Sequence, residues 1–182
     1  DMSYPEVNRR CAEIPVGSEG VLMLPFGNGA ERMLGNRYTG AEAIGLDLNR
    51  HDRFHLLRAA QEGIAFAFRY GMDVMRETGL RLRVIRAGYA NLFLSPVFRQ
   101  TLATLCGADI ELYNTDGALG AARGAALGAG LYASREETFA SLRKIDEVRP
   151  DPADRDVLER GYARWKAELE NRLGRASHGT SV

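Results

Sequence analysis

Short apolar runs alternate along this chain with longer amphipathic stretches, and this alternation restricts the fold more than any other feature. Strands are expected at 20–26 ("GVLMLPF", with Pro25 as its stop), 82–88 ("LRVIRAG") and 109–114 ("DIELYN"), because each run is short, apolar and bounded by turn-forming residues. Helices are expected at 52–77, from Ser95 to Gly107, from Asp116 onward and at 151–173. Strands separated by helices form βαβ units, so we predict an α/β domain with a partly parallel sheet.

Local signals mark the helix starts. Ser95 is an expected N-cap, because Pro96 follows it at the first helical position. Asp52, Asp116 and Asp151 stand at the other three starts, and Asp151 is also followed by a proline. Between the first strand and residue 40 the glycines and asparagines predict a loop, long enough to suggest a function.

The periodicity of each helix predicts its buried face. In the helix at 52–77 the expected buried stripe is Leu57, Ala60, Ile64, Ala67, Gly71 and Met75, and the expected solvent face is Arg58, Glu62, Arg69 and Arg76. In the last helix the expected buried stripe is Val157, Leu158, Tyr162, Trp165 and Leu169.

The helix after Asp116 carries glycine at 117, 120, 124 and 128. Each glycine costs about 1 kcal/mol relative to alanine in a helix interior. The segment is too short to span a membrane and contains Arg123. We therefore expect Gly120 and Gly124 to permit close packing on a sheet, or the helix N-terminus to approach a ligand.

Charge and composition exclude several classes of protein. The 182 residues are enough for one domain, and Lys+Arg equals Asp+Glu at 24 each, so neither nucleic acid nor a membrane is an expected partner. Cys11 and Cys106 form no disulfide framework, which favours a reducing, cytoplasmic setting. His51 and His55 lack an H-E-x-x-H motif and are expected at the surface or in a helix cap. No secretory signal is seen, and 175–182 is expected to be a disordered tail.

The stretch "IRAGYANLFLSPVFRQ" (85–100) places Gly88 between a strand and a helix. Glycine lets backbone N–H groups approach a phosphate or a purine without a Cβ in the way. The same turn is also compatible with an ordinary chain reversal, and the local pattern alone leaves both readings open.

Three stretches in this order resemble the C-terminal domain of the FGGY carbohydrate kinases, and of xylulokinases in particular. They are "LPFGNGAERMLGNRYTGAEAIGL" with the R-A-x-x-E-G-x-A-F-like helix that follows, "IRAGYANLFLSPVFRQTLATLCGADIEL", and "TDGALGAARGAALGAG". Together they cover most of residues 20–133.

The chain departs from the family pattern at several positions. Ala87 replaces the first glycine of the Gly-Gly pair, and "ANLFL" is more similar to glycerol kinases. Ala43 and Gln61 stand where larger apolar residues are usual. These departures leave the identity of the sugar open.

The resemblance implies an actin/hexokinase-like (ribonuclease H-like) lobe with a mixed sheet flanked by helices. Residues 1–174 would form the C-terminal, nucleotide-binding lobe of a two-lobe kinase that uses ATP and Mg²⁺, with adenosine held at Ala87, Gly88 and Asn91. The catalytic carboxylate, the phosphate-binding turns and the sugar pocket of the family precede this region. We therefore expect no catalytic and no metal-binding residue in this chain, and no activity from the chain alone.

The function implied for the full-length protein is phosphorylation of a ketose, with D-xylulose to D-xylulose 5-phosphate as the favoured reaction. The alternatives are a kinase of glycerol, ribulose or gluconate, and a non-catalytic actin-like binding or assembly module. A dinucleotide-binding oxidoreductase is disfavoured, because no strand leads into G-x-G-x-x-G with an acid about 20 residues on. The expected partners are ATP and a small sugar, and a homodimer is left open.

Overall fold

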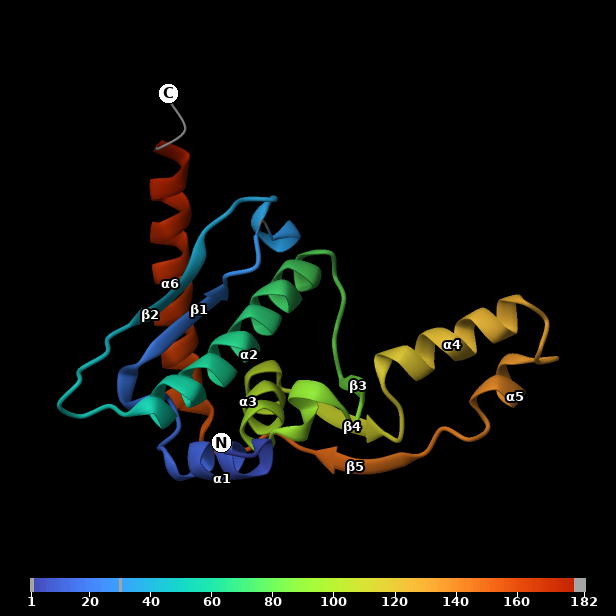
Figure 1. Ribbon diagram of the computed structural model, residues 1–182. Coiled ribbons are helices and arrows are strands. Elements are labelled where there is room, and N and C mark those ends of the chain that lie inside the picture. The colour runs from blue at the N-terminus through green and yellow to red at the C-terminus, as the bar shows by residue number, and fades with distance from the viewer. Residues whose placement is uncertain (1, 30, 179–182) are drawn as a thin grey trace.

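The computed structural model describes residues 2–29 and 31–178 (Figure 1). In chain order the elements are α1 (Tyr4–Glu13), η1 (Ser18–Gly20), β1 (Leu22–Phe26), η2 (Arg32–Leu34), β2 (Gly40–Ile44), α2 (Arg53–Glu77), β3 (Val84–Gly88), η3 (Asn91–Leu94), α3 (Pro96–Cys106), β4 (Asp109–Tyr113), α4 (Gly117–Gly128), α5 (Arg135–Phe139), β5 (Lys144–Val148) and α6 (Arg155–His178). The three η elements are short 3-10 turns. The α/β prediction is confirmed, although α1, β2, α5 and β5 were not expected from the sequence.

The larger sheet is mixed and has the order β3-β4-β5. Strands β3 and β4 run parallel, with Gly88 paired to Tyr113, and β5 runs antiparallel to β4. Ile110 and Leu112 of β4 are buried, and α3, which connects β3 to β4, contacts this sheet. The connection β3–α3–β4 is therefore the βαβ unit that the sequence predicts.

Strands β1 and β2 form a separate antiparallel pair. Pro25 does not end β1, because the strand continues to Phe26 and Pro25 is paired with Ala41. A proline is tolerated there because each strand of a two-stranded sheet is an edge strand. On its unpaired side an edge strand needs no N–H to donate to a neighbouring strand. The predicted loop connects the two strands and contains η2.

The buried face of α2 is not the predicted one. Leu57 and Met75 are exposed, whereas Arg58 and Glu62 are almost completely buried. The buried set also includes Phe54, His55, Ala59, Gln61, Gly63, Ala65, Phe66 and Met72. Arg58, Gln61 and Glu62 have hydrogen-bond partners from other parts of the chain, and periodicity alone cannot reveal such partners.

Helix α6 supplies the centre of the core, as its apolar stripe predicts. Trp165 is fully buried, its ring stacks on Tyr162 at a centroid distance of 6.1 Å, and its Nε1–H donates to the Met23 carbonyl at 2.8 Å. The helix continues through 175–178, which the sequence analysis assigns to a disordered tail, whereas 179–182 lie outside the described residues.

Helices α4 and α5 lie to one side of the rest of the molecule (Figure 1). Asp116 caps α4 as predicted, its carboxylate accepting the Leu119 N–H at 2.7 Å. No residue of α4 is buried, and no atom of the described residues lies within 4 Å of a Cβ built on Gly120 or Gly124. The prediction that this helix packs closely on a sheet is therefore wrong for the described residues.

Both cysteines, His51 and His55 are buried. Both cysteines are free and buried, and burial raises the pKa of Cys106 to about 11. His55 belongs to the capping box of α2 with Asp52, and the His51 Nδ1 accepts the Asp47 N–H at 3.0 Å. The prediction of a capping role is confirmed for His55, but both rings are buried rather than at the surface. Among the described residues, none of the helices has the length and apolar character to cross a bilayer.

Candidate functional site

The carboxyl ends of β3 and β4 lie together at one edge of the mixed sheet. Their parallel pairing ends at Gly88 and Tyr113. The turn after β3 leads into η3, and the turn after β4 leads to the N-cap of α4, Asp116. Open α/β sheets bind ligands beyond the carboxyl ends of their parallel strands. The topology therefore points to this edge as the place for a ligand.

Gly88 has a structural reason to be glycine. A Cβ at this position would lie 2.3 Å from the Thr115 carbonyl oxygen and 3.1 Å from the Asp116 Cα. Both atoms belong to the backbone, so they cannot move aside as a flexible side chain could. Gly88 thus allows the end of β3 to pack on the β4–α4 turn, whether or not a ligand is bound.

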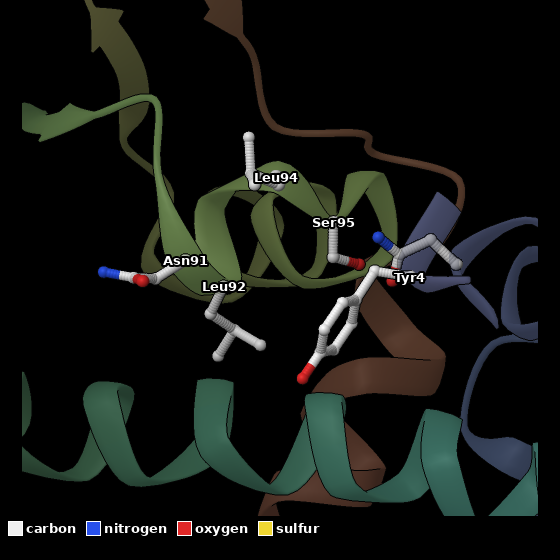
Figure 2. A pocket seen from close by; sticks show the side chains of 6 residues that line it. Tyr4, Asn91, Leu92, Leu94 and Ser95 are labelled. Carbon is white, nitrogen blue, oxygen red and sulfur yellow. The ribbon is translucent and has the colours of Figure 1, made fainter. Parts of the chain in front are cut away.

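Asn91 starts η3 in the left-handed backbone region, with φ at 51°. Asparagine tolerates this region better than most residues with a side chain. Its carboxamide is exposed and extends away from the helical turn (Figure 2). Unusual backbone conformations concentrate at functional sites, and here the conformation presents an amide to solvent at the end of the sheet.

The turn that carries Asn91 is fixed to the body of the protein through Ser95. The Ser95 hydroxyl donates to Gln61 Oε1 on α2 and accepts the Phe98 N–H at 3.3 Å, which caps α3. Gln61 is one of the departures from the family pattern, and this contact satisfies its buried carboxamide oxygen. The η3 turn is therefore held between α2 and α3.

A pocket of about 470 Å³ lies between η3 and α1. We call it the Tyr4 pocket, and its lining consists of Tyr4, Asn8, Asn91, Leu92, Leu94 and Ser95. Figure 2 shows Tyr4 and Leu92 extending in the same direction, with Asn91 at one end. An aromatic ring, two leucines and two carboxamides provide apolar walls and a few hydrogen-bonding groups, which is the composition of many small-molecule sites.

Two smaller recesses adjoin the ends of the strands. One is lined by Gly88, Asn91, Asp116 and Gly117 among others, so Asn91 belongs to it as well as to the Tyr4 pocket. The other lies over the sheet and includes Ala87 and Gly88. The structure thus brings the predicted residues Gly88 and Asn91 to one recess. Ala87 packs partly against the core and lines the recess over the sheet.

Glu111, a charged group near this edge, is engaged with neighbouring side chains. Glu111 accepts hydrogen bonds from Arg86 Nε and from the Tyr113 hydroxyl, both at 2.9 Å, and these lower its pKa. A carboxylate neutralised in this way is a poor base. Nowhere in the described parts of the chain do three or more His, Cys, Asp or Glu side chains gather as a metal site would require.

Tyr4 and Asn8 were not predicted as site residues, because the helix that carries them was not predicted. A signal for α1 was nevertheless present in the sequence. Ser3 accepts the Glu6 N–H as an N-cap and Pro5 lies in the first turn. A serine that is followed by a proline in the first helical turn, and by a glutamate three positions after the serine, indicates a helix start.

Curated relatives of this chain are sugar kinases. It is 30% identical over 179 residues to xylulose kinase from Haemophilus influenzae, covering 93% of this chain and 35% of the relative. It is 30% identical over 173 residues to L-xylulose/3-keto-L-gulonate kinase from Escherichia coli, covering 91% of this chain and 33% of the relative. The chain thus spans about a third of the length of these relatives.

A solved structure of a sugar kinase is also similar to this chain. Xylulose kinase from Rhodospirillum rubrum superposes with a TM-score of 0.76 at 26% identity, over 96% of this chain and 35% of that protein. The expectation of an actin/hexokinase-like lobe is thereby confirmed.

The sequence pattern of the C-terminal domain of the FGGY carbohydrate kinases matches residues 10–133. This segment includes β3, η3 and the start of α4, which together form the edge described above. The chain therefore belongs to the FGGY family of carbohydrate kinases.

Proposed function

We propose that this chain is the nucleotide-binding lobe of an ATP-dependent carbohydrate kinase, and that adenosine binds in the Tyr4 pocket beside Asn91. The observation that carries the proposal is the position of Asn91. Its strained backbone presents a free-standing carboxamide where the Tyr4 pocket meets the recess at Gly88. Family membership supplies the class of ligand.

The chemistry of the pocket suits a purine. The Tyr4 ring and the Leu92 side chain offer apolar surface to the faces of a flat base (Figure 2). The carboxamides of Asn8 and Asn91 each contain a donor and an acceptor, which suits the mixed donor and acceptor edge of adenine.

The phosphates would leave the pocket past Asn91, toward the recess at Gly88 and the first turn of α4. We assign no Mg²⁺ ligand to this edge, because no three His, Cys, Asp or Glu side chains of the described residues gather there and one oxygen of Asp116 accepts the Leu119 N–H. Phosphoryl transfer depends on positioning and on stabilisation of charge, and we assign only positioning of the nucleotide to this chain.

The remainder of the polypeptide would cover the apolar surface that this chain leaves open. Ile64, Phe68, Gly71 and Met75 of α2 line a surface groove together with Met33. Among the described strands β3 has a partner on one side only. Since the relatives are about three times as long, we propose that the other lobe and its connecting segment occupy these surfaces, and that the chain alone is inactive.

D-xylulose is the substrate that we propose for the full-length protein, with D-xylulose 5-phosphate as product. The support is the name xylulose kinase, which a curated relative and the neighbouring solved structure share. The second relative acts on L-xylulose and 3-keto-L-gulonate, so a panel of ketoses and polyols, including glycerol, ribulose and gluconate, is the assay that tests the sugar.

The nucleotide site is tested by Asn91→Ala and Tyr4→Ala in the full-length protein. Loss of one amide contact, worth about 0.5–1.5 kcal/mol, should raise KM for ATP about two- to tenfold and leave KM for the sugar unchanged. Asn36 is also exposed with φ at 59°, so Asn36→Ala controls for backbone strain. Tyr38→Ala controls for loss of an exposed tyrosine.

If the site and control variants have the same KM for ATP, the Tyr4 pocket is not the adenosine site. Gly88 is unsuitable for this test. Any side chain there would clash with the Thr115 carbonyl and change the fold, whatever the role of the turn in binding.

A further inference from the structure

Two charged side chains of α2 are buried against the segment that follows α1. Arg58 is 5% exposed and Glu62 is 2% exposed. Arg58 Nε donates to Glu62 Oε1 at 2.8 Å. The sequence places both residues on a solvent face, so their burial calls for partners elsewhere in the chain.

Those partners are backbone groups at the C-terminal end of α1. Arg58 Nη1 donates to the carbonyls of Cys11 at 3.1 Å and Ile14 at 2.7 Å. The Gly17 N–H donates to Glu62 Oε1 at 3.0 Å. The last carbonyls of a helix lack partners within the helix and favour a cation. Arg58 therefore caps α1 from a neighbouring helix, while Glu62 holds the turn beyond it.

The pair works as a unit because neither charge is tolerable alone in this position. Breaking a buried ion pair by removing one partner leaves an uncompensated buried charge. Burial raises the pKa of Glu62, and the charge and hydrogen bond of Arg58 act against this rise. Close by, the Ser18 hydroxyl donates to the His55 carbonyl at 2.6 Å, which adds a further link to α2.

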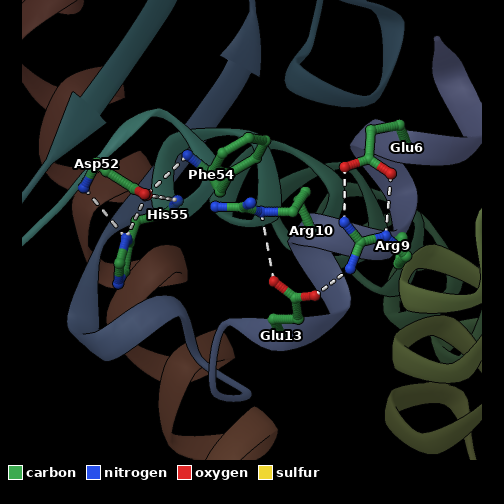
Figure 3. A network of polar contacts seen from close by, with 7 residues as sticks. All are labelled: Glu6, Arg9, Arg10, Glu13, Asp52, Phe54 and His55. Carbon is green, nitrogen blue, oxygen red and sulfur yellow. Dashed lines mark hydrogen bonds and ion pairs between the residues drawn. The ribbon is translucent and has the colours of Figure 1, made fainter. Parts of the chain in front are cut away.

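Apolar contacts of α1 lie at this end and reach its middle, where Val7 packs on the same small cluster. Cys11 packs with Phe54 and Val97 in a small apolar cluster, and the Arg10 guanidinium lies 4.7 Å from the Phe54 ring centre (Figure 3). By contrast, the ion pairs of Arg9 with Glu6 and Glu13 lie within α1 itself and do not attach it to the body (Figure 3).

Of the two residues of α1 that line the pocket, Tyr4 starts the helix at the other end and Asn8 lies near its middle. A helix of 10 residues is about 15 Å long. A tilt of about 10° at the attached end would therefore move Tyr4 by roughly 2.5 Å. That displacement is large compared with the tolerance of a hydrogen-bonded or stacked ligand.

We propose that Arg58 and Glu62 are positioning residues for the nucleotide. They fix the orientation of α1 and thereby hold Tyr4 and Asn8 opposite Asn91 in the Tyr4 pocket. This role rests on the proposed function, since it acts through the adenosine site. Neither side chain touches the nucleotide, so this buried ion pair of α2 affects nucleotide binding only through α1.

The test uses Arg58→Lys and Glu62→Gln in the full-length protein. Lysine keeps the charge but lacks the fork that reaches two carbonyls and a carboxylate together. We expect KM for ATP to rise threefold or more with little change in KM for the sugar. Arg9→Lys and Glu13→Gln are the matched controls, because that pair has the same i, i+4 spacing but is exposed. If Glu62→Gln does not fold, Ser18→Ala loosens the same junction by a single hydrogen bond.

Amide hydrogen exchange in α1, measured on the same variants without nucleotide, separates the explanations. Faster exchange in α1 together with a raised KM for ATP supports the proposal. Unchanged exchange overturns it, as does faster exchange with an unchanged KM for ATP while Tyr4→Ala still raises that KM. If Tyr4→Ala and Asn91→Ala also leave the KM for ATP unchanged, the pocket assignment itself is wrong and this role is lost with it.

Discussion

Helices α2 and α4 both contain glycine in their interiors, but for different reasons. A Cβ on Gly63 of α2 would lie 2.2 Å from the Met23 carbonyl oxygen and 3.1 Å from its carbon. A Cβ on Gly120 or Gly124 of α4 would meet no atom of the described residues within 4 Å. The first glycine is required by the packing of α2 on β1, whereas no contact within the described residues requires the other two.

The comparison shows that the free-energy cost of a glycine in a helix interior does not by itself indicate which contact compensates for that cost. Helix α2 has a long buried face, whereas α4 is attached by its N-cap and by Arg123, which donates to the hydroxyls of Thr115 at 3.3 Å and Ser141 at 2.9 Å. Short helices without tertiary packing are marginal in water. No contact within the described residues explains the glycines of α4.

The largest effect is expected at Gly63. Gly63→Ala places a methyl group on the Met23 carbonyl, so β1 must separate from α2, and the hydrogen bond from Trp165 to the same carbonyl is disturbed. We expect a loss of about 3 kcal/mol in the free energy of unfolding, measured as a lower denaturant midpoint.

Gly71→Ala in the same helix is the matched control, since no atom of the described residues lies within 4 Å of its Cβ position. It should stabilise the protein by up to about 1 kcal/mol through helix propensity. Similar midpoints for the two variants would mean that α2 does not approach β1 as closely as described.

An intermediate effect is expected at Asp73, which ties α2 to α6. Its carboxylate accepts hydrogen bonds from Arg69 and Arg76, both at 2.9 Å, and from the Tyr162 hydroxyl at 2.8 Å. Burial acts to raise the pKa of Asp73, but these hydrogen bonds outweigh burial and hold the pKa below its ordinary value of 3.8.

A carboxyl group with a lowered pKa in the folded state stabilises the fold fully above its ordinary pKa, and this contribution is lost as the pH falls through the lowered value. Asp73→Asn should cost about 2 kcal/mol at pH 7 and remove part of the decline in stability on acidification. Stability curves of the two proteins that run parallel from pH 7 to pH 2 would contradict this role.

The sequence predicted the features that local chemistry determines. Ser95 and Asp116 cap their helices as expected, and the parallel pairing of β3 with β4 follows from the strand–helix–strand order. Strand β5 was missed because its sequence, "KIDEV", is largely charged, and such a pattern is compatible with an edge strand but does not reveal one.

Features that depend on distant partners were not predictable. The buried face of α2 was misassigned because Arg58 and Glu62 look solvent-exposed until Cys11, Ile14 and Gly17 are placed beside them. For the same reason, the sequence predicted only part of the candidate site. The family resemblance supplied the β3 turn, but the wall formed by Tyr4 comes from a helix whose contact with η3 no local pattern encodes.

The smallest effect is expected in α4, where it sharpens the comparison with α2. Gly124→Ala should stabilise α4 by less than about 1 kcal/mol, seen as slower amide exchange in this helix with an unchanged midpoint for the core. Gly124→Leu should behave similarly in this chain, because the position is open. If the other lobe packs on α4 in the full-length protein, the same leucine should cost about 1–3 kcal/mol there through overpacking. Equal tolerance of Gly124→Leu in both proteins would show that α4 stays uncovered. Destabilisation already in this chain would show that α4 packs against a surface within the chain itself, as the sequence had suggested.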